Sequence, residues 1–470
     1  MSAARITSNG ASPPRQSASP GLPIREERCS RRMSRETHML DSDLVSENRA
    51  QAGPRVLVTD TNRWPSPARL AIGLSKLGCR VSGVCPTRGH PLLSTRVVRQ
   101  TFPYSSLRPL ESLAAAIEAT SPDIIVPCDD RGVQHLHELF ARAHTDGKSG
   151  AKLAALIERS LGAPANYPVV SSRYDLLRIA REEGVRVPDT APVKRAEDLD
   201  SWQAGHPFPW VLKADGTFGG RGVKVAQNRE QAERFFAEMS RPHRFARVFK
   251  RLIVNRDPFW LRPWWKRSRP AIVVQSHIQG HPANSAVFCW EGRVLAGVCV
   301  EVVSSDGSTG PAIIVRVVDN PAMMFAAERI ARRLGLSGFF GLDFMVDEAD
   351  GEAYLIEMNP RCTPLSHLQL GPGHDMIEAL SAQLSGRPLR ESPPVTHNDV
   401  IAYFPQAWTT KSPFLESGFL DIPQEEPELV KDLLRPWPER SLLYRLVSKV
   451  SATTTAVAGR KAARHGVSKI

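Results

Sequence analysis

The chain has 470 residues, of which 41% are hydrophobic and 23% charged, and its formal net charge is +12. This composition is ordinary for a soluble protein with a sizeable core, and the length suggests about three domains. No apolar run approaches the roughly 18–20 residues that a membrane-spanning helix needs. The seven cysteines form no Cys-x-x-Cys pair, so we expect buried, reduced thiols in a cytoplasmic protein rather than disulfides or a metal site.

The positive charge is concentrated in two segments of the chain. Residues 241–270 carry ten Lys or Arg and one acid, and residues 435–470 carry eight Lys or Arg and one acid. The rest of the chain is mildly acidic. The high net charge is therefore no argument for a nucleic-acid-binding core, and we expect no specific nucleic acid partner.

Ordered structure is expected to begin after an N-terminal extension. Residues 1–52 are rich in Ser, Pro and Arg without apolar periodicity, which predicts disorder. A strand is expected at RVLVTD, and alternating helix-like and strand-like stretches follow at residues 67–78, 79–85, 110–120, 122–128 and 132–143. This alternation predicts a parallel α/β domain over residues 53–165.

Two acidic residues follow the strand-like stretch PDIIVPC. Asp129 and Asp130 would lie at the carboxyl end of that strand, where open α/β sheets bind ligands. Ordinary loop carboxylates are an equally good interpretation. The first turn of the domain lacks a glycine fingerprint, so no dinucleotide is expected there.

A glycine-rich loop lies at residues 212–225, LKADGTFGGRGVKV. It has neither the Lys-Ser/Thr ending of a P-loop nor the glycine spacing of a dinucleotide site. Both flanks resemble strands, so the loop is predicted to be the tip of a β-hairpin. Gly219, Gly220 and Gly222 would let backbone N–H groups close over phosphate oxygens, with the charge of Lys213 beneath them. A plain turn is an equally good interpretation of this loop alone.

A second hairpin is predicted at residues 339–361, FFGLDFMVDEADGEAYLIEMNPR. With the acidic turn at its centre, Asp343 and Glu357 oppose each other, and Asn359 lies on the same face. Two carboxylates in apolar strands would repel and desolvate each other without a cation between them. These hard oxygen ligands suit Mg²⁺, or Mn²⁺, bridging nucleotide phosphates. A surface hairpin with acids by chance is the less favoured interpretation.

Taken together, the two hairpins resemble those of the ATP-grasp superfamily. The glycine hairpin after Lys213 is followed by GLDFMVD and LIEMNPR, and the resemblance covers roughly residues 55–390. It implies ATP bound between two α+β subdomains over residues 166–390, with metal ions between the acidic hairpin and the triphosphate. The implied fold class is an N-terminal parallel α/β domain followed by a two-subdomain ATP-grasp fold.

The resemblance also implies a chemistry. A carboxylate attacks the γ-phosphoryl group, and an amine, a thiol or another nucleophile captures the acyl phosphate. Arg361 resembles the arginine that steadies the substrate carboxylate or the acyl phosphate in this family. Arg316, isolated in the apolar stretch AIIVRVV, is a second candidate for that role, although an arginine at a sheet edge is an equally good interpretation.

Three positions, in two regions, depart from the family pattern. Arg173 stands where a lysine often precedes the glycine hairpin, and it could still hold an ATP phosphate. The nucleotide hinge, residues 275–282, reads QSHIQGHP, in which Ser276 and Pro282 replace the usual acids. The adenosine would then be held by Gln275 or by the hinge backbone at Ile278.

The expected function is an ATP-dependent carboxylate–amine ligase that acts on small molecules. Similar biotin carboxylases carry a glutamate base after the equivalent arginine, whereas this chain reads RCTPLSHL, so bicarbonate activation is less favoured. A carbamoyl-phosphate synthetase large chain is also less favoured, because only one glycine hairpin and one acidic hairpin are present. The alternative is a catalytically degenerate, nucleotide-binding sensor or scaffold.

The two basic segments suggest further contacts. The insertion at 241–270 combines ten cations with three tryptophans, a composition that suits a membrane surface or an acidic partner, or an insertion packed on the domain. Residues 391–470 are expected to form a C-terminal extension with a basic tail. A homodimer is one expected assembly.

Overall fold

The computed structural model describes residues 53–87, 89–143, 147–215, 222–241, 270–307, 310–391, 393–394, 398–410, 413–415 and 418–435. All of them belong to one compact unit, Gly53–Ile470. Residues 1–52, which are predicted to be disordered, lie outside the described residues. So do residues 242–269 of the basic insertion, for which partners are predicted, and residues 436–470 of the basic tail.

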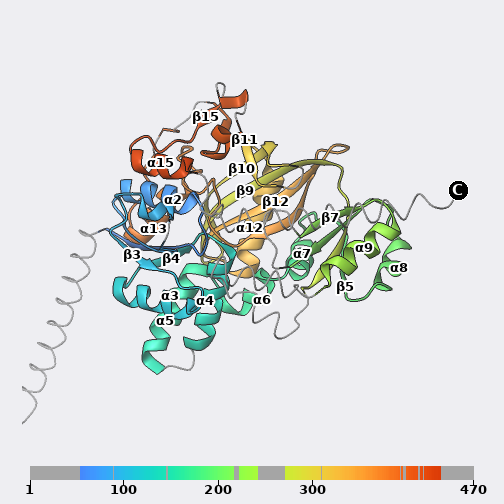
Figure 1. Ribbon diagram of the computed structural model, residues 1–470, viewed down its shortest axis with the longest axis horizontal. Coiled ribbons are helices and arrows are strands. Elements are labelled where there is room, and N and C mark those ends of the chain that lie inside the picture. The colour runs from blue at the N-terminus through green and yellow to red at the C-terminus, as the bar shows by residue number, and fades with distance from the viewer. Residues whose placement is uncertain are drawn as a thin grey trace, which may run out of the picture. The chain divides into compact units, whose positions relative to one another are not determined.

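The first sheet is parallel, with the strand order β3-β2-β1-β4. Its strands are β1 (Arg55–Thr59), β2 (Arg80–Cys85), β3 (Gln100–Pro103) and β4 (Ile124–Pro127). Its helices are α2 (Ser66–Lys76), α3 (Pro109–Thr120), α4 (Asp130–Ala143) and α5 (Gly147–Leu161) (Figure 1). The predicted parallel α/β alternation is confirmed. The sequence analysis missed β3, a short exposed edge strand, and α5.

Alternating side chains place helices on both faces of this sheet. Val56 and Val58 of β1 pack in one core cluster with the apolar side of α2. Leu57, which points the other way, packs in another cluster with α3, α4 and α5. The sheet is therefore buried on both faces, as parallel sheets usually are. Its carboxyl edge, where β1 and β4 end, remains available for a site.

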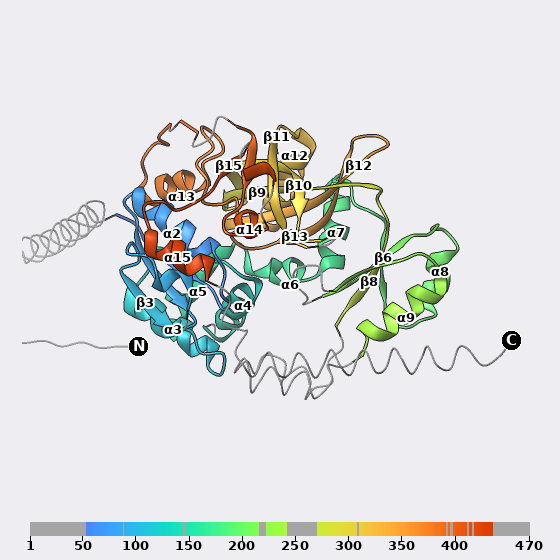
Figure 2. The same ribbon diagram turned by 45° about the horizontal axis from the view of Figure 1, so that its top comes forward.

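The second sheet is antiparallel, with the order β5-β8-β6-β7. Its strands are β5 (Thr190–Val193), β6 (Trp210–Ala214), β7 (Val223–Ala226) and β8 (Ile272–Ser276), and its helices are α8 (Asp198–Gln203) and α9 (Arg229–Met239). Figure 2 shows both helices beside β6 and β8, and they bury Leu199, Trp202 and Ala232 against the strands. The pairing of β6 with β7 confirms the predicted glycine-loop hairpin.

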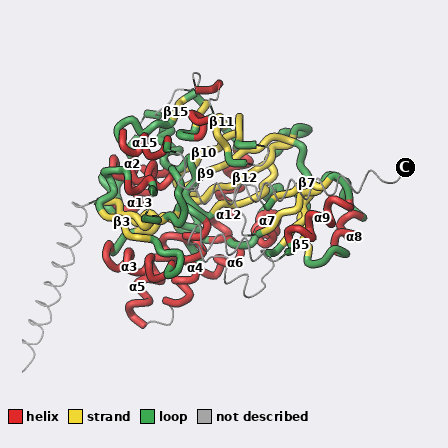
Figure 3. The backbone as a smooth tube through the Cα atoms, viewed as in Figure 1, coloured by secondary structure: helices red, strands yellow, loops and turns green. Residues whose placement is uncertain are grey.

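The third sheet has seven strands in the order β13-β12-β9-β10-β11-β14-β15. Figure 3 shows strands of this sheet in yellow, with β9, β10, β11 and β12 labelled. They are β9 (Gly280–Trp290), β10 (Arg293–Ser305), β11 (Ala312–Val318), β12 (Gly338–Asp347), β13 (Ala353–Asn359), β14 (Val400–Ala402) and β15 (Phe419–Leu420). Helices α7 (Arg173–Glu182) and α12 (Pro321–Leu334) pack in one core cluster with this sheet, and α13 (Met376–Ser385) packs in another. The C-terminal segment thus contributes two strands to a sheet that begins at residue 280.

Short elements complete the described part of the chain. They are α6 (Tyr167–Val170), α14 (Gln406–Thr409), α15 (Pro427–Leu434) and the 3-10 helices η1 (Pro91–Leu93), η2 (Pro164–Asn166) and η3 (Pro413–Leu415). The six described cysteines are free and buried, as predicted. Across the described ranges, no helix combines the length and the apolar character needed to cross a bilayer.

Candidate active site

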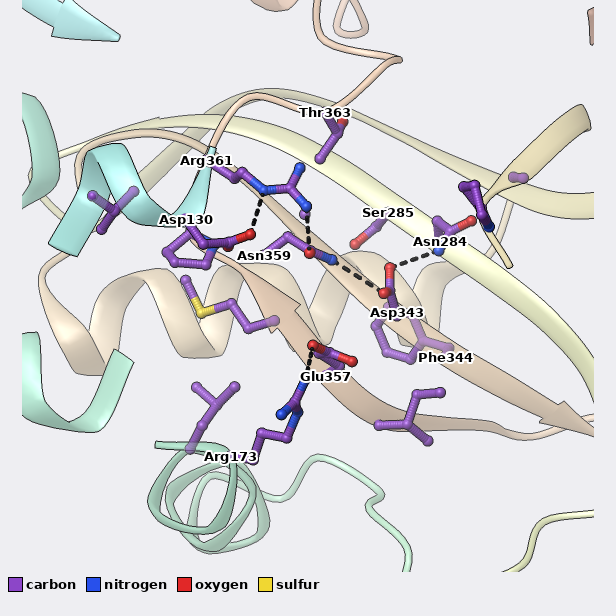
Figure 4. A pocket seen from close by; sticks show the side chains of 18 of the residues that line it. Asp130, Arg173, Asn284, Ser285, Asp343, Phe344, Glu357, Asn359, Arg361 and Thr363 are labelled. Carbon is purple, nitrogen blue, oxygen red and sulfur yellow. Dashed lines mark hydrogen bonds and ion pairs between the residues drawn. The ribbon is translucent and has the colours of Figure 1, made fainter. Parts of the chain in front are cut away.

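A cavity of about 1140 Å³ is lined by residues from all three sheets and their connections. Asp130 reaches it from the first sheet, Lys213 from the second, and Asp343 from the third. Figure 4 shows the polar side chains that gather on its wall. This volume is slightly above the range of about 300–1,000 Å³ that is typical of small-molecule sites, so the cavity could hold two reactants together.

The acidic hairpin forms one side of the cavity in the predicted register. β12 and β13 are antiparallel, and Asp343 pairs with Glu357. Asn359 donates from Nδ2 to Asp343 Oδ2 at 3.1 Å, so the three residues share one face. Asn284 of β9, the neighbouring strand, donates from Nδ2 to the other oxygen of Asp343 at 2.6 Å (Figure 4).

The electrostatics of this face suit a cation. Burial, together with the facing charge of Glu357, raises the pKa of Asp343 to about 6. A divalent ion between the two carboxylates would remove that penalty. Among the described residues there is no group of three or more His, Cys, Asp or Glu arranged to hold a metal. A metal here would therefore use two carboxylates and an amide oxygen, a donor set that fits Mg²⁺.

Two cations face the acidic hairpin. Lys213 is 4% exposed and donates from Nζ to the carbonyl oxygen of Ile356 at 3.2 Å. Burial lowers its pKa to about 8, although Glu357 acts in the opposite direction. Arg173 begins α7, whose N-cap is Ser172, and its guanidinium donates to Glu357 Oε1 at 2.6 Å. Lys213 and Arg173 thus lie beside the carboxylates. There they could also neutralise the negative charge of a metal-bound triphosphate.

The glycine loop is described at its two ends, residues 212–215 and 222–225. Gly219 and Gly220 lie outside the described residues, so their predicted phosphate contacts stay predictions. Gly222 lines the cavity, and its carbonyl oxygen accepts from Ala214 N at 3.0 Å.

The hinge residues also line the cavity. Gln275, at 1% exposure, has an Nε2 without a hydrogen-bond partner in the described part of the chain. Ile278 lies on the same wall, as do Ser276 and Pro282, the residues that replace the usual acids. A buried amide donor with no partner is costly, and a ligand acceptor would satisfy it.

Arg361 connects the acidic hairpin to the first sheet. Its Nε donates to Asp130 Oδ2 at 3.0 Å, and a terminal nitrogen donates to Asn359 Oδ1 at 3.0 Å (Figure 4). Burial alone would lower the pKa of Arg361, but the charge and hydrogen bond of Asp130 raise it above its usual range. Arg361 thus stays charged while it lines the cavity.

The two neighbouring acids after β4 separate in the structure. Asp130 lines the cavity, whereas Asp129 accepts from Gly132 N at 3.0 Å and from Asn62 Nδ2 at 2.8 Å. Burial, followed by the charge of Asp60, raises the pKa of Asp129 to about 7. Asp130 is therefore the residue that can act in the site, and Asp129 holds the loop that positions it.

The structure does not bring Arg316 to the cavity. It is exposed on β11, opposite Glu301 of β10, and does not line the cavity wall. The second arginine proposed from the sequence is thus a strand residue that extends into solvent, as long cationic side chains at sheet surfaces often do.

The sequence analysis missed two residues of the wall, Asn284 and Ser285. It named Asp130 but missed its contact with Arg361. Ser285 is 2% exposed, and its Oγ has no hydrogen-bond partner among the described residues. The signal for the first two was a pair of polar residues inside an otherwise apolar strand, ANSAVF. No local pattern signalled the contact between Asp130 and Arg361.

Comparison with known families agrees with this architecture. Residues 170–364 match the family model of the ATP-grasp domain. This stretch of the chain is an ATP-grasp domain. The match contains Arg173, Lys213, Asp343, Glu357 and Arg361, and the parallel α/β layer precedes it.

Solved ATP-grasp structures share the fold. The biotin carboxylase domain of Hydrogenobacter thermophilus 2-oxoglutarate carboxylase, solved with MgADP and bicarbonate, is 16% identical with a TM-score of 0.51, over 73% of this chain and 72% of that one. The N5-carboxyaminoimidazole synthetase of Staphylococcus aureus, solved with ADP, is 13% identical with a TM-score of 0.51, over 72% and 79%. At such identities the likeness shows the fold alone.

The curated relatives match this chain over only part of their own length. The carbamoyl phosphate synthase large chain of Vibrio cholerae is 23% identical over 231 residues, which are 46% of this chain and 19% of that protein. The carbamoyl-phosphate synthase of Methanobrevibacter smithii is 24% identical over 219 residues, 44% of this chain and 53% of that protein. The chain thus spans about half, or less, of the length of these relatives.

Proposed function

We propose that this protein is an ATP-dependent ligase that activates a carboxylate as an acyl phosphate and transfers the acyl group to an amine. The observation that carries the proposal is one cavity that joins Lys213, the carboxylate pair and Arg361. The first two suit a metal-bound triphosphate, and Arg361 suits an acyl group beside it.

Each residue has a distinct role in the proposed reaction. Lys213 and Arg173 bind phosphate oxygens, and Gln275 with the hinge backbone at Ile278 binds the adenosine. Asp343, Glu357 and Asn359 would hold Mg²⁺, which would neutralise charge on the phosphates when bound. Gly222, on the cavity wall, contacts the phosphates. Arg361, fixed by Asp130, binds the carboxylate of the acid.

The bonds change in two steps. An oxygen of the acid attacks the γ-phosphorus, the bond from that phosphorus to the β–γ bridging oxygen breaks, and ADP leaves. The nitrogen of the amine then attacks the acyl carbon, its C–O bond to the phosphate breaks, and the departing phosphate takes the proton of the amine. The chain contributes position and charge neutralisation, since phosphoryl transfer needs little covalent help from the protein.

The decisive test follows an oxygen atom. The full chain is incubated with MgATP and a panel of small carboxylates and amines, and the release of ADP and phosphate is measured. The pair that stimulates release is then repeated with oxygen-18 in the carboxylate. We expect the label in the released phosphate, because the oxygen that bridges carbon and phosphorus leaves with phosphorus.

Other outcomes identify other functions. AMP and pyrophosphate would indicate adenylation, and phosphate labelled from bicarbonate would indicate bicarbonate activation. Tight binding of ATP without stimulation by any carboxylate would favour a nucleotide-binding sensor or scaffold. Pro282 and Ser276 on the cavity wall, in place of the usual hinge acids, are the observation that keeps this second candidate open.

A further inference from the structure

A second part of the same cavity is built from residues outside the ATP-grasp match. Trp64 and Arg69 come from the connection after β1 and from α2, and Tyr403, Phe404 and Gln406 come from the C-terminal segment. We call these five residues the acceptor part of the cavity. Tyr403 and Phe404 are buried and Trp64 is half-buried, so this part has aromatic walls.

The C-terminal segment is fixed in this position. β14 pairs with β11, and Tyr403 N donates to the carbonyl oxygen of Ile313 at 2.9 Å. Asp421 accepts a hydrogen bond from Arg69 and makes another with His367 Nε2 at 2.7 Å. The side chains of Arg69, His367 and Asp421 are 10%, 8% and 6% exposed. This buried cluster ties the C-terminal segment to α2 and to the loop after β13.

Two polar atoms of the acceptor part have no partner in the described part of the chain. Arg69 Nε is buried without an acceptor, and Gln406 Oε1 is buried without a donor. Buried polar atoms are nearly always hydrogen-bonded in native proteins, by protein or by water, so both atoms are candidates for contacts with a ligand. Arg69 Nε is a charged donor, and Gln406 Oε1 is a neutral acceptor.

The charges around Arg69 favour an anion beside it. Asp421 is shared by Arg69 and His367, and Glu425, a second carboxylate near enough to act on Arg69, is paired with Lys76. Arg69 therefore keeps a donor for a further anionic group, and a guanidinium N–H binds a carboxylate through a charge-assisted hydrogen bond. Aromatic side chains beside such a contact would lower the local dielectric and strengthen it.

We propose that the acceptor part binds the amine substrate and selects an amine that itself carries a carboxylate. Arg69 Nε–H donates to that carboxylate, Gln406 Oε1 accepts a hydrogen bond from an N–H of the same molecule, and Trp64, Tyr403 and Phe404 contact its apolar body. This inference rests on the proposed ligase function, because it names the class of the nucleophile.

The test uses matched ligands that differ only in the carboxylate. Saturation-transfer NMR and calorimetry with the full chain and MgADP compare L-phenylalanine, L-leucine and L-alanine with their amides, and L-phenylalanine with 2-phenylethylamine. We expect each carboxylated member to bind at least tenfold more tightly than its partner. Equal binding within every pair would overturn the proposal.

Variants assign the preference to residues. In Arg69→Met the carboxylate preference should fall to about one, and in Gln406→Leu the carboxylated amines should bind about tenfold more weakly. Trp408→Ala is the control, since Trp408 lies in the same short helix but is 50% exposed and does not line the cavity. Thermal melting verifies that each variant folds. If Arg69→Met unfolds, Gln406→Leu alone decides, and unchanged binding in it would overturn the proposal.

Failure of this inference can be distinguished from failure of the ligase proposal. ADP release that amines with and without a carboxylate stimulate equally would leave the ligase intact and overturn the selectivity. Binding of carboxylated amines that depends on Gln406, without carboxylate-dependent ADP release from any pair, would support the site and overturn the ligase.

Discussion

The phosphate-facing part of the cavity and its acceptor part are assembled from the chain in different ways. The first is concentrated on one hairpin and its neighbours, where Asp343, Glu357 and Asn359 follow from strand alternation within a few residues. The second combines the connection after β1, α2 and the C-terminal segment, and Arg69 is held there by Asp421, 352 residues further along the chain.

This difference has a consequence for specificity. The residues proposed to face the phosphates lie within the ATP-grasp match, residues 170–364, and would serve a step that any acyl phosphate chemistry needs. The acceptor part lies outside that match. A common reaction can thus be combined with a particular substrate, because function depends on sites placed on a shared fold.

The largest expected effect falls on the carboxylate pair. Glu357→Gln should lower ADP release by about a thousandfold or more while the protein stays folded, because removing a group aimed at transition-state charge costs roughly 10²–10³ in rate and here also weakens the metal site. Steady-state ADP release and circular dichroism are the measurements. Glu352→Gln, just before the same strand and half exposed, is the control and should retain activity. Normal turnover of Glu357→Gln would contradict the metal assignment.

Asp130→Asn tests the contact between Asp130, at the start of α4, and Arg361, after the acidic hairpin. Asp130→Asn should reduce carboxylate-dependent ADP release by about tenfold to a hundredfold, since Arg361 loses the partner that fixes it, while the Kd for ATP changes less than about twofold. The control is Glu111→Gln, which removes an exposed charge from the first turn of α3 that does not line the cavity. A parallel loss of ATP affinity would instead place Arg361 on the phosphates.

Lys213 tests the phosphate contact. Lys213→Ala should weaken ATP binding by roughly 1.5–3 kcal/mol, which is a factor of about 10–150 in Kd, because a charge-assisted hydrogen bond is lost. Calorimetry with MgATP measures this change. Lys224→Ala, on the facing strand of the same sheet and exposed, should bind ATP normally. An unchanged Kd in Lys213→Ala would show that this side chain does not reach the nucleotide.

The lowered pKa of Lys213 predicts how ATP affinity varies with pH. The free protein holds this lysine with a pKa of about 8, so its charge is present below that pH and is lost above it. Because phosphate favours the charged form, the Kd for ATP should be constant from pH 6.5 to 7.5 and increase by up to about tenfold by pH 9. In Lys213→Ala this increase should disappear. A wild-type Kd that stays flat to pH 9 would contradict the assignment.

The smallest expected effect concerns Arg316. Since this side chain is exposed on β11 away from the cavity wall, Arg316→Ala should leave both ADP release and the Kd for ATP within about twofold of the wild type. Surface substitutions of this kind usually change stability by less than about 0.5 kcal/mol. A loss of more than tenfold in ADP release would return Arg316 to the list of candidate catalytic residues.

The sequence by itself determined the parts of the site that depend on local periodicity. Strand alternation around one acidic turn placed Asp343 opposite Glu357, with Asn359 on the same face, and the structure confirms that register. The glycine hairpin with Lys213 at its base followed from a pattern of a few residues, whereas Arg173 was selected through the family resemblance. The parallel α/β layer likewise followed from the alternation of its elements.

Tertiary structure alone decided the contacts between distant segments. Asp130 and Arg361 are 231 residues apart, and Arg69 and Asp421 are 352 apart, so no local period relates them. Each pair is brought together by the packing of the helices of the first domain against the segments that follow β13 and β15. The same packing left Arg316 exposed. The sequence could not predict this, because one polar residue in an apolar strand does not reveal which face of the sheet is covered. Local spacing therefore determined where charge is placed on each hairpin, and long-range packing decided which charges share a cavity.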